Sequence, residues 1–278
     1  MLPLAELHEP RDDVEGLIVA NEPVPLELLP GLRVVGNFGV GYDRIDVATC
    51  AARGVVVTNT PGVLDAATAD LAFALILAAR RQVVAGDRVV RSGGWSGSWS
   101  DGALAEEVSG STLGIVGLGR IGSAVARRAR GFDMRVLYTR RLRADSDLGE
   151  WRALDDLLAE SDVVTLHVPL TPETDGLLDA RRLSLLRGGA TLVNTARGEI
   201  VDEPALVREL VSARIGAGLD VFVHEPDVPA ALRELPNVVL TPHLGSATRE
   251  TREAMTRLVV DNLLAVERGD PPLTPVAS

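Results

Sequence analysis

Short runs of apolar, β-branched residues recur along the chain and alternate with stretches that carry apolar residues at helical spacing. Nine runs predict strands, at residues 16–20, 32–38, 54–60, 112–117, 134–139, 162–168, 190–196, 215–222 and 237–243. The helix-like stretches between them include residues 123–131, 153–162, 179–189 and 203–213. Continuous apolar strands that alternate with helices are typical of parallel sheets covered on both faces. The pattern therefore predicts an α/β fold with doubly wound parallel sheets.

Two longer segments depart from this alternation and indicate how the chain is divided. Residues 65–90 consist almost entirely of helix formers and separate three early strands from six later ones. The last helical segment, residues 248–269, has no strand after it, so we expect it to pack back on the first domain. We predict two Rossmann-like domains: a first domain at residues 1–73, to which residues 253–278 return, and a second at residues 74–252.

The composition restricts the kinds of partner. Among 278 residues, 39 are acidic and 28 basic, giving a formal net charge of -11, and none of the basic residues is a lysine. A field of this sign repels nucleic acid and anionic lipid, so we expect neither as a partner and expect any anion to be bound locally by arginine. The start of the chain lacks a signal-peptide pattern, which favours a cytoplasmic location. Cys50 is the only cysteine, so we predict no disulfide and no metal site.

Three glycines with a dinucleotide-binding spacing follow the fourth predicted strand. The stretch GLGRIG places Gly117, Gly119 and Gly122 in the order G-x-G-x-x-G. The spacing alone is a weak signal, but between strand and helix these glycines permit a tight turn, the approach of a pyrophosphate and close helix packing. The amides of Arg120 and Ile121 at the helix start would face the phosphates. We therefore predict a dinucleotide site in the second domain, with an ordinary strand-to-helix turn as the alternative.

Arginines follow the next strand, at the point where an NAD site usually carries an acidic residue. The chain reads Thr139, Arg140 and Arg141 there. A carboxylate would bind the ribose 2′-hydroxyl of NAD, whereas guanidinium groups bind a 2′-phosphate through charge-assisted hydrogen bonds. We expect NADP(H) as the preferred cofactor, with NAD(H) possible. The alternative is a solvated basic loop, and for Arg143 we expect an ordinary surface position.

Three residues suited to proton-coupled hydride transfer stand near the ends of later strands, which meet at one edge of a parallel sheet. Arg197 would pair with the carboxylate of a 2-keto acid, and His243 would exchange the hydroxyl proton. Glu225 would orient the imidazole and raise its pKa, which favours the protonated form that reduction needs. Each residue alone has a structural alternative, as a helix cap or a solvated side chain. Their combination favours catalysis.

The other histidines and the tryptophans of the glycine-rich loop give weaker signals. We expect His8 and His224 to be solvated, and His167 to be structural or to line the cofactor site. Trp95 and Trp99 either close a substrate pocket or pack at a dimer contact, and packing is favoured.

A string of motifs runs in fixed order over nearly the whole chain: FGVGYDRID, TNTPGVLDAATADLAFALILAARR, STLGIVGLGRIG, HVPLTPETDGLL, LVNTARGEIVDE, GAGLDVFVHEP and VVLTPHLGSAT. In this order they resemble the D-isomer-specific 2-hydroxyacid dehydrogenases, and within them the glyoxylate/hydroxypyruvate reductase branch. The resemblance implies a homodimer formed through the helix and arm at residues 65–105. Members of this family usually have a further strand and helix before the counterpart of residues 16–20, so we expect an exposed sheet edge in the first domain.

The resemblance also implies roles for individual residues. The catalytic arginine, glutamate and histidine of the family correspond to Arg197, Glu225 and His243. The amides of Val40 and Gly41 would bind the substrate carboxylate together with Arg197, as a nest of N–H groups can. The remaining cofactor contacts would be Asp220, which holds the nicotinamide carboxamide, and Pro169, Thr174, Thr195, Ala196 and Gly245.

These features predict an NADPH-preferring oxidoreductase that reduces small 2-keto acids, such as glyoxylate or hydroxypyruvate, to D-2-hydroxy acids. An alternative from a different class is a dinucleotide-sensing interaction protein of the corepressor type, which binds the cofactor without turnover. Cofactor binding alone does not require an arginine, a glutamate and a histidine at the strand ends.

Overall fold

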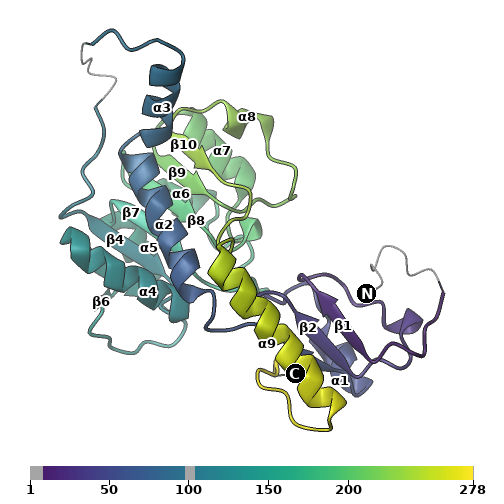
Figure 1. Cartoon of the computed structure of the whole chain (residues 1–278). Coiled ribbons are helices and arrows are strands. Elements are labelled where there is room, and N and C mark those ends of the chain that lie inside the picture. The colour runs from purple at the N-terminus through teal and green to yellow at the C-terminus, as the bar shows by residue number, and fades with distance from the viewer. Residues whose placement is uncertain (1–8, 98–103, 278) are drawn as a thin grey trace. The chain divides into compact units, whose positions relative to one another are not determined.

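The computed structural model describes residues 9–97 and 104–277, which form two compact units. Unit 1 comprises Met1–Leu64 and Ser246–Ser278, and unit 2 comprises Asp65–Gly245 (Figure 1). Each unit is built on one sheet whose strands all pair in parallel, so the predicted α/β class is confirmed. The domain boundaries predicted after residues 73 and 252 remain a prediction. His8 and Trp99 lie outside the described residues.

Unit 1 contains a sheet in the order β1-β2-β3. Its elements are β1 Gly16–Val19, η2 Leu26–Leu28, β2 Val34–Asn37, α1 Val47–Ala52, β3 Val56–Thr58 and α9 Arg249–Glu267. One face packs with α1 around Val35, Val57 and Cys50. The other face is covered by α9, and a Cβ at Gly36 would lie 2.6 Å from Leu263. The predicted return of the C-terminal helix to the first domain is therefore confirmed.

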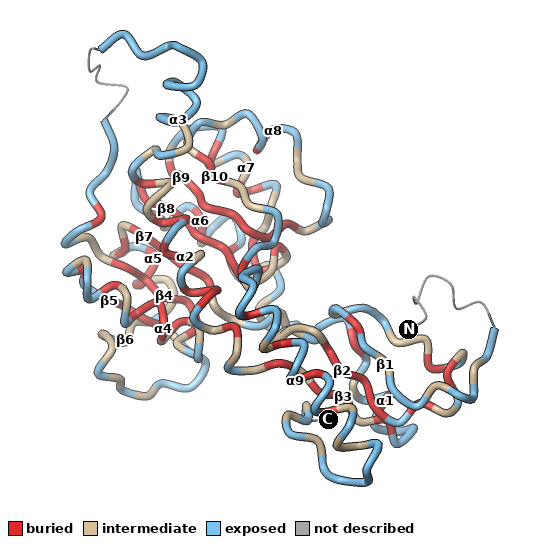
Figure 2. Tube along the Cα trace, viewed as in Figure 1, coloured by how far each residue is buried: buried red, intermediate tan, exposed pale blue. Residues whose placement is uncertain are grey.

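Unit 2 contains a sheet in the order β10-β9-β8-β7-β4-β5-β6. The strands are β4 Thr112–Val116, β5 Arg135–Thr139, β6 Glu150–Trp151, β7 Val163–Leu166, β8 Thr191–Asn194, β9 Gly216–Leu219 and β10 Val238–Leu240. The four consecutive strands β4, β7, β8 and β9 are almost entirely buried, as Figure 2 shows. This burial explains why they read in the sequence as unbroken apolar runs.

Helices cover both faces of this sheet. The helices of unit 2 are α2 Asp65–Arg80, α3 Val83–Arg91, α4 Arg120–Ala129, α5 Leu154–Glu160, α6 Ala180–Leu185, α7 Glu203–Val211 and α8 Ala230–Arg233, with the short η4 Arg130–Phe132 and η5 Gly198–Ile200, and all but α3 pack on the sheet or its edges. One core cluster joins α2 and α4 to the sheet, and a second joins α5, α6, α7 and α8 to its other face. The predicted doubly wound arrangement is confirmed for this unit.

Several helices begin at side chains that the sequence marks as N-caps. An oxygen of the N-cap side chain accepts a hydrogen bond from the backbone amide three residues later, which satisfies one of the free donors of the first turn. The helices capped in this way are α1 by Asp46, α6 by Asp179, α7 by Asp202 and α9 by Thr248.

The segment at residues 65–90, which consists almost entirely of helix formers, forms two helices, α2 and α3, and the break between them was not predicted. Arg80, which ends α2, is buried, and its guanidinium donates to the backbone oxygens of Glu107 (2.9 Å) and Asp162 (3.1 Å). Gln82 then adopts a left-handed conformation with φ of 51°, and α3, which buries no residue, begins at Val83. A short strand, β6, was also not predicted. Among residues 9–97 and 104–277, no helix has the length and apolar character needed to cross a bilayer.

Candidate active site

The glycine loop of unit 2 lies where the strand order reverses. The neighbours of β4 are β5 on one side and β7 on the other, and GLGRIG connects β4 to α4. In open parallel sheets the crevice at such a switch point, beyond the carboxyl ends of the strands, is where ligands bind.

Each glycine of the loop meets a different spatial requirement. Gly117 has a φ of 101°, and a Cβ there would lie 2.6 Å from the His167 oxygen. A Cβ at Gly122 would lie 2.1 Å from the Gly117 oxygen, so the first turn of α4 requires a glycine at position 122. Gly119, in contrast, has open space where its Cβ would be, and as N-cap of α4 it provides no side-chain cap. The amides that begin α4, including Arg120 and Ile121, therefore face open space that suits a pyrophosphate.

A buried hydroxyl at the end of β8 supports the same interpretation. Among the described residues, Thr195 Oγ1 is buried without a hydrogen-bond partner. Such a group costs free energy unless a ligand or water satisfies it. On the neighbouring β7 loop, Thr174 Oγ1 donates to the Pro169 oxygen at 2.6 Å, which fixes the two predicted cofactor residues of that loop. The residues present thus fit a dinucleotide.

The loop after β5 presents arginine. Thr139 ends the strand, and the side chains of Arg140 and Arg141 that follow are exposed. No ion pair engages either guanidinium within the described parts of the chain. They are therefore available to an anionic group of a bound nucleotide.

The carboxylate of Asp220 organises the end of β9. Asp220 is fully buried, and its oxygens accept hydrogen bonds from Thr241 Oγ1 (2.6 Å), Leu244 N (2.7 Å) and Gly245 N (2.9 Å). Burial raises the pKa of Asp220, although these hydrogen bonds and the nearby His243 oppose the rise. The Asp220 backbone oxygen also accepts from His243 N at 2.9 Å. One residue thus fixes the whole segment from Thr241 to Gly245.

His243 and Glu225 are in direct contact. Nδ1 of His243 lies 2.8 Å from Oε2 of Glu225, whose Oε1 accepts from Phe222 N at 3.0 Å. The carboxylate requires a proton on Nδ1, which leaves Nε2 to face a reactant. The His243 side chain is 49% exposed and that of Glu225 32% exposed, so solvent reaches the pair.

Opposing influences act on the Glu225 carboxyl. Burial, the largest of them, raises its pKa, but the hydrogen bonds from His243 and Phe222 N and the charges of His243 and Arg197 together lower the pKa below its ordinary value. Arg197 thus lies within electrostatic reach of Glu225. The structure brings the three predicted catalytic side chains to the same end of the sheet of unit 2.

The loop that carries Arg197 is held by a residue that sequence reasoning missed. Asn194 is buried at the end of β8, where its side-chain oxygen accepts from Ala196 N (3.0 Å) and its amide donates to the Arg197 oxygen (2.7 Å). Gly198 follows, and a Cβ there would lie 2.2 Å from the backbone of Phe222. This close approach joins the Arg197 loop to the segment that leads to Glu225. An asparagine that ends an apolar strand is the signal that could have found Asn194.

The predicted carboxylate-binding loop of unit 1 is also held by asparagines. Asn37 Nδ2 donates to the oxygens of Gly39 (3.1 Å) and Gly41 (2.8 Å), and Asn59 Nδ2 donates to the Val40 oxygen (2.9 Å). Across residues 9–97 and 104–277, the amides of Val40 and Gly41 have no acceptor. Because the carbonyl groups of this loop accept hydrogen bonds from the asparagines, and the two N–H groups remain available as donors, the loop suits an anion such as a carboxylate.

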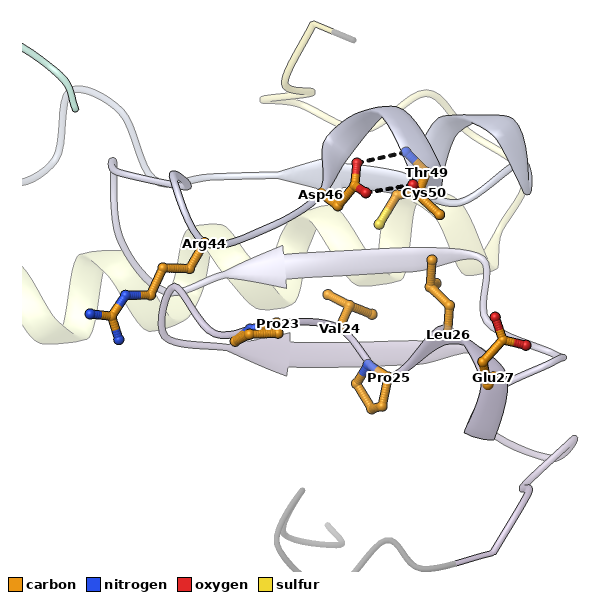
Figure 3. A pocket seen from close by; sticks show the side chains of 9 residues that line it. All are labelled: Pro23, Val24, Pro25, Leu26, Glu27, Arg44, Asp46, Thr49 and Cys50. Atoms are coloured by element: carbon orange, nitrogen blue, oxygen red, sulfur yellow. Dashed lines mark hydrogen bonds between the residues drawn. The ribbon is translucent and has the colours of Figure 1, made fainter. Parts of the chain in front are cut away.

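A separate hollow of about 270 Å³ lies in unit 1 between the loop at residues 23–27 and α1. Figure 3 shows that Asp46 on its helical wall is hydrogen-bonded to Thr49, as the N-cap of α1. Burial raises the pKa of the Cys50 thiol, which keeps it protonated. Asp46 thus serves as a helix cap and Cys50 as a protonated core side chain, and none of the predicted site residues contributes to this hollow.

Comparison with known proteins gives consistent matches. The family model "D-isomer specific 2-hydroxyacid dehydrogenase, NAD binding domain" matches residues 73–245. The glyoxylate reductase of Pyrococcus furiosus is 51% identical over 286 residues, covering 98% of this chain and 85% of that protein, and the one from Pyrococcus horikoshii is 52% identical over 257 residues, covering 89% and 77%. A solved structure, the NADPH-dependent glyoxylate/hydroxypyruvate reductase of Sinorhizobium meliloti with NADP and malonate, has a TM-score of 0.90 at 42% identity and covers 96% of this chain and 85% of that one.

The lowered pKa of Glu225 predicts a pH-dependent stability. Because its pKa in the folded state lies below the ordinary 4.5, the stabilisation is fully present above that value and is lost as the pH falls through the lower folded-state pKa. At neutral pH, we expect Glu225→Gln to reduce the free energy of unfolding by about 1 kcal/mol. Urea unfolding of both proteins, repeated down to about pH 3, measures the difference. It should shrink on acidification, and a difference independent of pH would contradict the assigned cause.

Proposed function

Because the chain belongs to the D-isomer-specific 2-hydroxyacid dehydrogenase family, we propose that it is an NADPH-preferring reductase of small 2-keto acids such as glyoxylate and hydroxypyruvate. Membership makes it an NAD(P)-dependent oxidoreductase acting on a CH–OH group, and the relatives named glyoxylate reductase support a 2-keto acid as substrate. The observation that carries the proposal is the hydrogen bond between His243 and Glu225 at the end of a dinucleotide-binding sheet. The expected product is the D-2-hydroxy acid.

The reaction divides between the cofactor and the side chains. A bound reduced nicotinamide supplies the hydride that adds to the keto carbon. Nε2 of His243 donates its proton to the keto oxygen, which becomes the hydroxyl group of the product. Glu225 accepts the hydrogen bond from Nδ1–H and so fixes the orientation of the ring. After turnover the neutral imidazole takes up a proton from solvent at its exposed side.

The proposed donors to the substrate carboxylate are on one loop of each unit. We assign the guanidinium of Arg197 to this carboxylate and to polarisation of the adjacent carbonyl. The amides of Val40 and Gly41 add two further donors. Pairing with Arg197 would orient the keto carbon.

The cofactor would be held by residues at the carboxyl ends of the unit 2 strands. Gly117, Gly119, Arg120, Ile121 and Gly122 would bind the pyrophosphate through the start of α4. The other contacts would come from Pro169, Thr174, Thr195, Ala196, Asp220 and Gly245, and Asp220 would accept a hydrogen bond from the nicotinamide carboxamide. Arg140 and Arg141, with Thr139, would bind the 2′-phosphate, which supports NADPH over NADH.

We also propose that the protein works as a homodimer. The described part of residues 83–104 exposes several large apolar side chains, namely those of Val83, Val89, Val90, Trp95 and Leu104. Exposed large apolar side chains that recur along one segment favour a protein interface there. The alternative of a dinucleotide sensor is not favoured, since binding a dinucleotide does not require the Glu225–His243 pair.

Removal of the imidazole tests the proton donor. We expect His243→Ala to lower kcat by roughly 10²- to 10⁴-fold, the usual contribution of general acid catalysis. Binding of NADPH, followed by cofactor fluorescence, should be unchanged. His224→Ala, an exposed histidine two residues after Phe222, is the matched control and should keep wild-type turnover. A His243→Ala enzyme with wild-type kcat would refute the assignment.

Charge reversal at Arg140 tests the cofactor preference. Arg140→Asp removes a donor to the 2′-phosphate and adds a repelling charge, so KM for NADPH should rise roughly tenfold or more while KM for NADH stays nearly constant. Steady-state kinetics with both cofactors gives the ratio. Arg208→Asp on α7 changes the surface charge equally and should leave the ratio unaltered. Equal effects of Arg140→Asp on both cofactors would remove the argument for NADPH.

A further inference from the structure

We infer that the stacking of Arg143 on Trp151 positions Arg140 and Arg141 for the 2′-phosphate, so that Arg143 sets cofactor selectivity without touching the phosphate. The inference deepens the proposed preference for NADPH and rests on it. Arg143 is a positioning residue in this account, and it is the one arginine of the stretch LYTRRLR that was expected to be merely solvated.

The ring that receives Arg143 is a fixed platform. The guanidinium carbon of Arg143 lies 4.6 Å from the centroid of the Trp151 ring, within the range of a cation–π contact. Trp151 belongs to β6 and stands opposite Tyr138 in the pairing of β5 with β6. Its ring packs, with Leu148 and Phe132, against the core cluster beneath α2 and α4. The contact with Trp151 therefore anchors the Arg143 side chain to the core of unit 2.

A second contact fixes the residue that follows. The Tyr138 side chain is completely buried, and its hydroxyl donates to the Ala144 oxygen at 2.6 Å. Further along, Arg130 donates to the Asp147 oxygen at 2.7 Å. The loop is thus held from Arg143 onwards, and only the segment from Arg140 to Leu142 projects between two fixed points.

The projecting segment carries the two guanidinium groups assigned to the phosphate. Arg140 and Arg141 are exposed and, in the described parts of the chain, make no ion pair. The pKa of Glu173 is lowered mainly by its hydrogen bond with Thr171 and to a smaller extent by the charge of Arg141. Arg141 therefore lies within electrostatic reach of Glu173, in the β7 loop that holds Pro169 and Thr174. Loss of the contact between Arg143 and the Trp151 ring would let the segment from Arg140 to Leu142 move. The guanidinium groups of Arg140 and Arg141 would then no longer be held in one position.

Two nucleotides that differ only in the 2′-phosphate isolate the effect. We expect Arg143→Ala to weaken binding of 2′,5′-ADP by roughly two- to fivefold, the size of an exposed cation–π contact, and to leave binding of 5′-AMP unchanged. Isothermal titration calorimetry of the full chain gives both constants without turnover. Trp151→Leu should reproduce the loss although it keeps every arginine, and Trp151→Phe, which keeps an aromatic face, should restore most of the affinity. Leu142→Ala, an exposed neighbour, should bind like wild type.

A double-mutant cycle separates positioning from direct contact. If Arg143 acts through the ring, Arg143→Ala combined with Trp151→Leu binds 2′,5′-ADP no more weakly than Trp151→Leu alone. A further loss in the double variant would overturn the inference, because Arg143 would then act on the phosphate itself. Should Trp151→Leu fail to fold, salt dependence decides: Arg143→Ala should keep the wild-type dependence of 2′,5′-ADP binding on ionic strength, and a shallower dependence would show a direct contact.

The outcome is distinguishable from failure of the proposed function. If Arg140→Asp weakens 2′,5′-ADP binding and Arg143→Ala does not, only the positioning role is wrong. If neither variant affects 2′,5′-ADP binding, the loop does not bind the 2′-phosphate, and the preference for NADPH fails with it.

Discussion

A single buried carboxylate, that of Asp220, holds the arrangement on which the chemistry depends. Its oxygens satisfy one hydroxyl and two amides of the segment from Thr241 to Gly245, and its raised pKa reflects a burial that these donors only partly offset. Within that segment His243 has a φ of 53°, a conformation that residues other than glycine rarely adopt. Such a backbone persists only where its surroundings over-determine it. Asp220 thus holds the strained backbone of His243, while Glu225 holds its ring.

The same principle governs how an acidic protein binds anions. With a formal net charge of -11, the overall field of the protein disfavours a dinucleotide and a keto acid alike. Binding therefore depends on local N–H donors that have no acceptor within the described part of the protein itself. Asn37 and Asn59 engage the carbonyls around Val40 and leave its amide free, while Gly119 leaves the start of α4 uncovered. Arginine, always charged and with fixed donor geometry, is suited to the remaining contacts that we propose.

Sequence periodicity predicted the two parallel sheets, because buried strands of this kind need continuous apolar runs, and residue types at strand ends indicated Arg197, Glu225 and His243 as candidates. The scaffold around them was not predictable, since which carbonyl Asn194 binds is decided by tertiary contacts. The same limit explains β6, whose two residues carry no periodic signal. Because β6 was not predicted, the pairing of Trp151 with Tyr138 could not be predicted either. The role inferred for Arg143 depends on that pairing. The left-handed conformation of Gln82 after α2 was also not predictable, because glutamine has no preference for it.

The central claim is that the His243–Glu225 pair makes this dinucleotide-binding protein a catalyst rather than a sensor. Steady-state oxidation of NADPH, measured with a panel of 2-keto acids that includes glyoxylate and hydroxypyruvate, tests it most directly. The account predicts NADPH oxidation that depends on the keto acid and yields the 2-hydroxy acid, in the D configuration wherever the product has a stereocentre. Intact NADPH binding with no turnover of any member of the panel would contradict it.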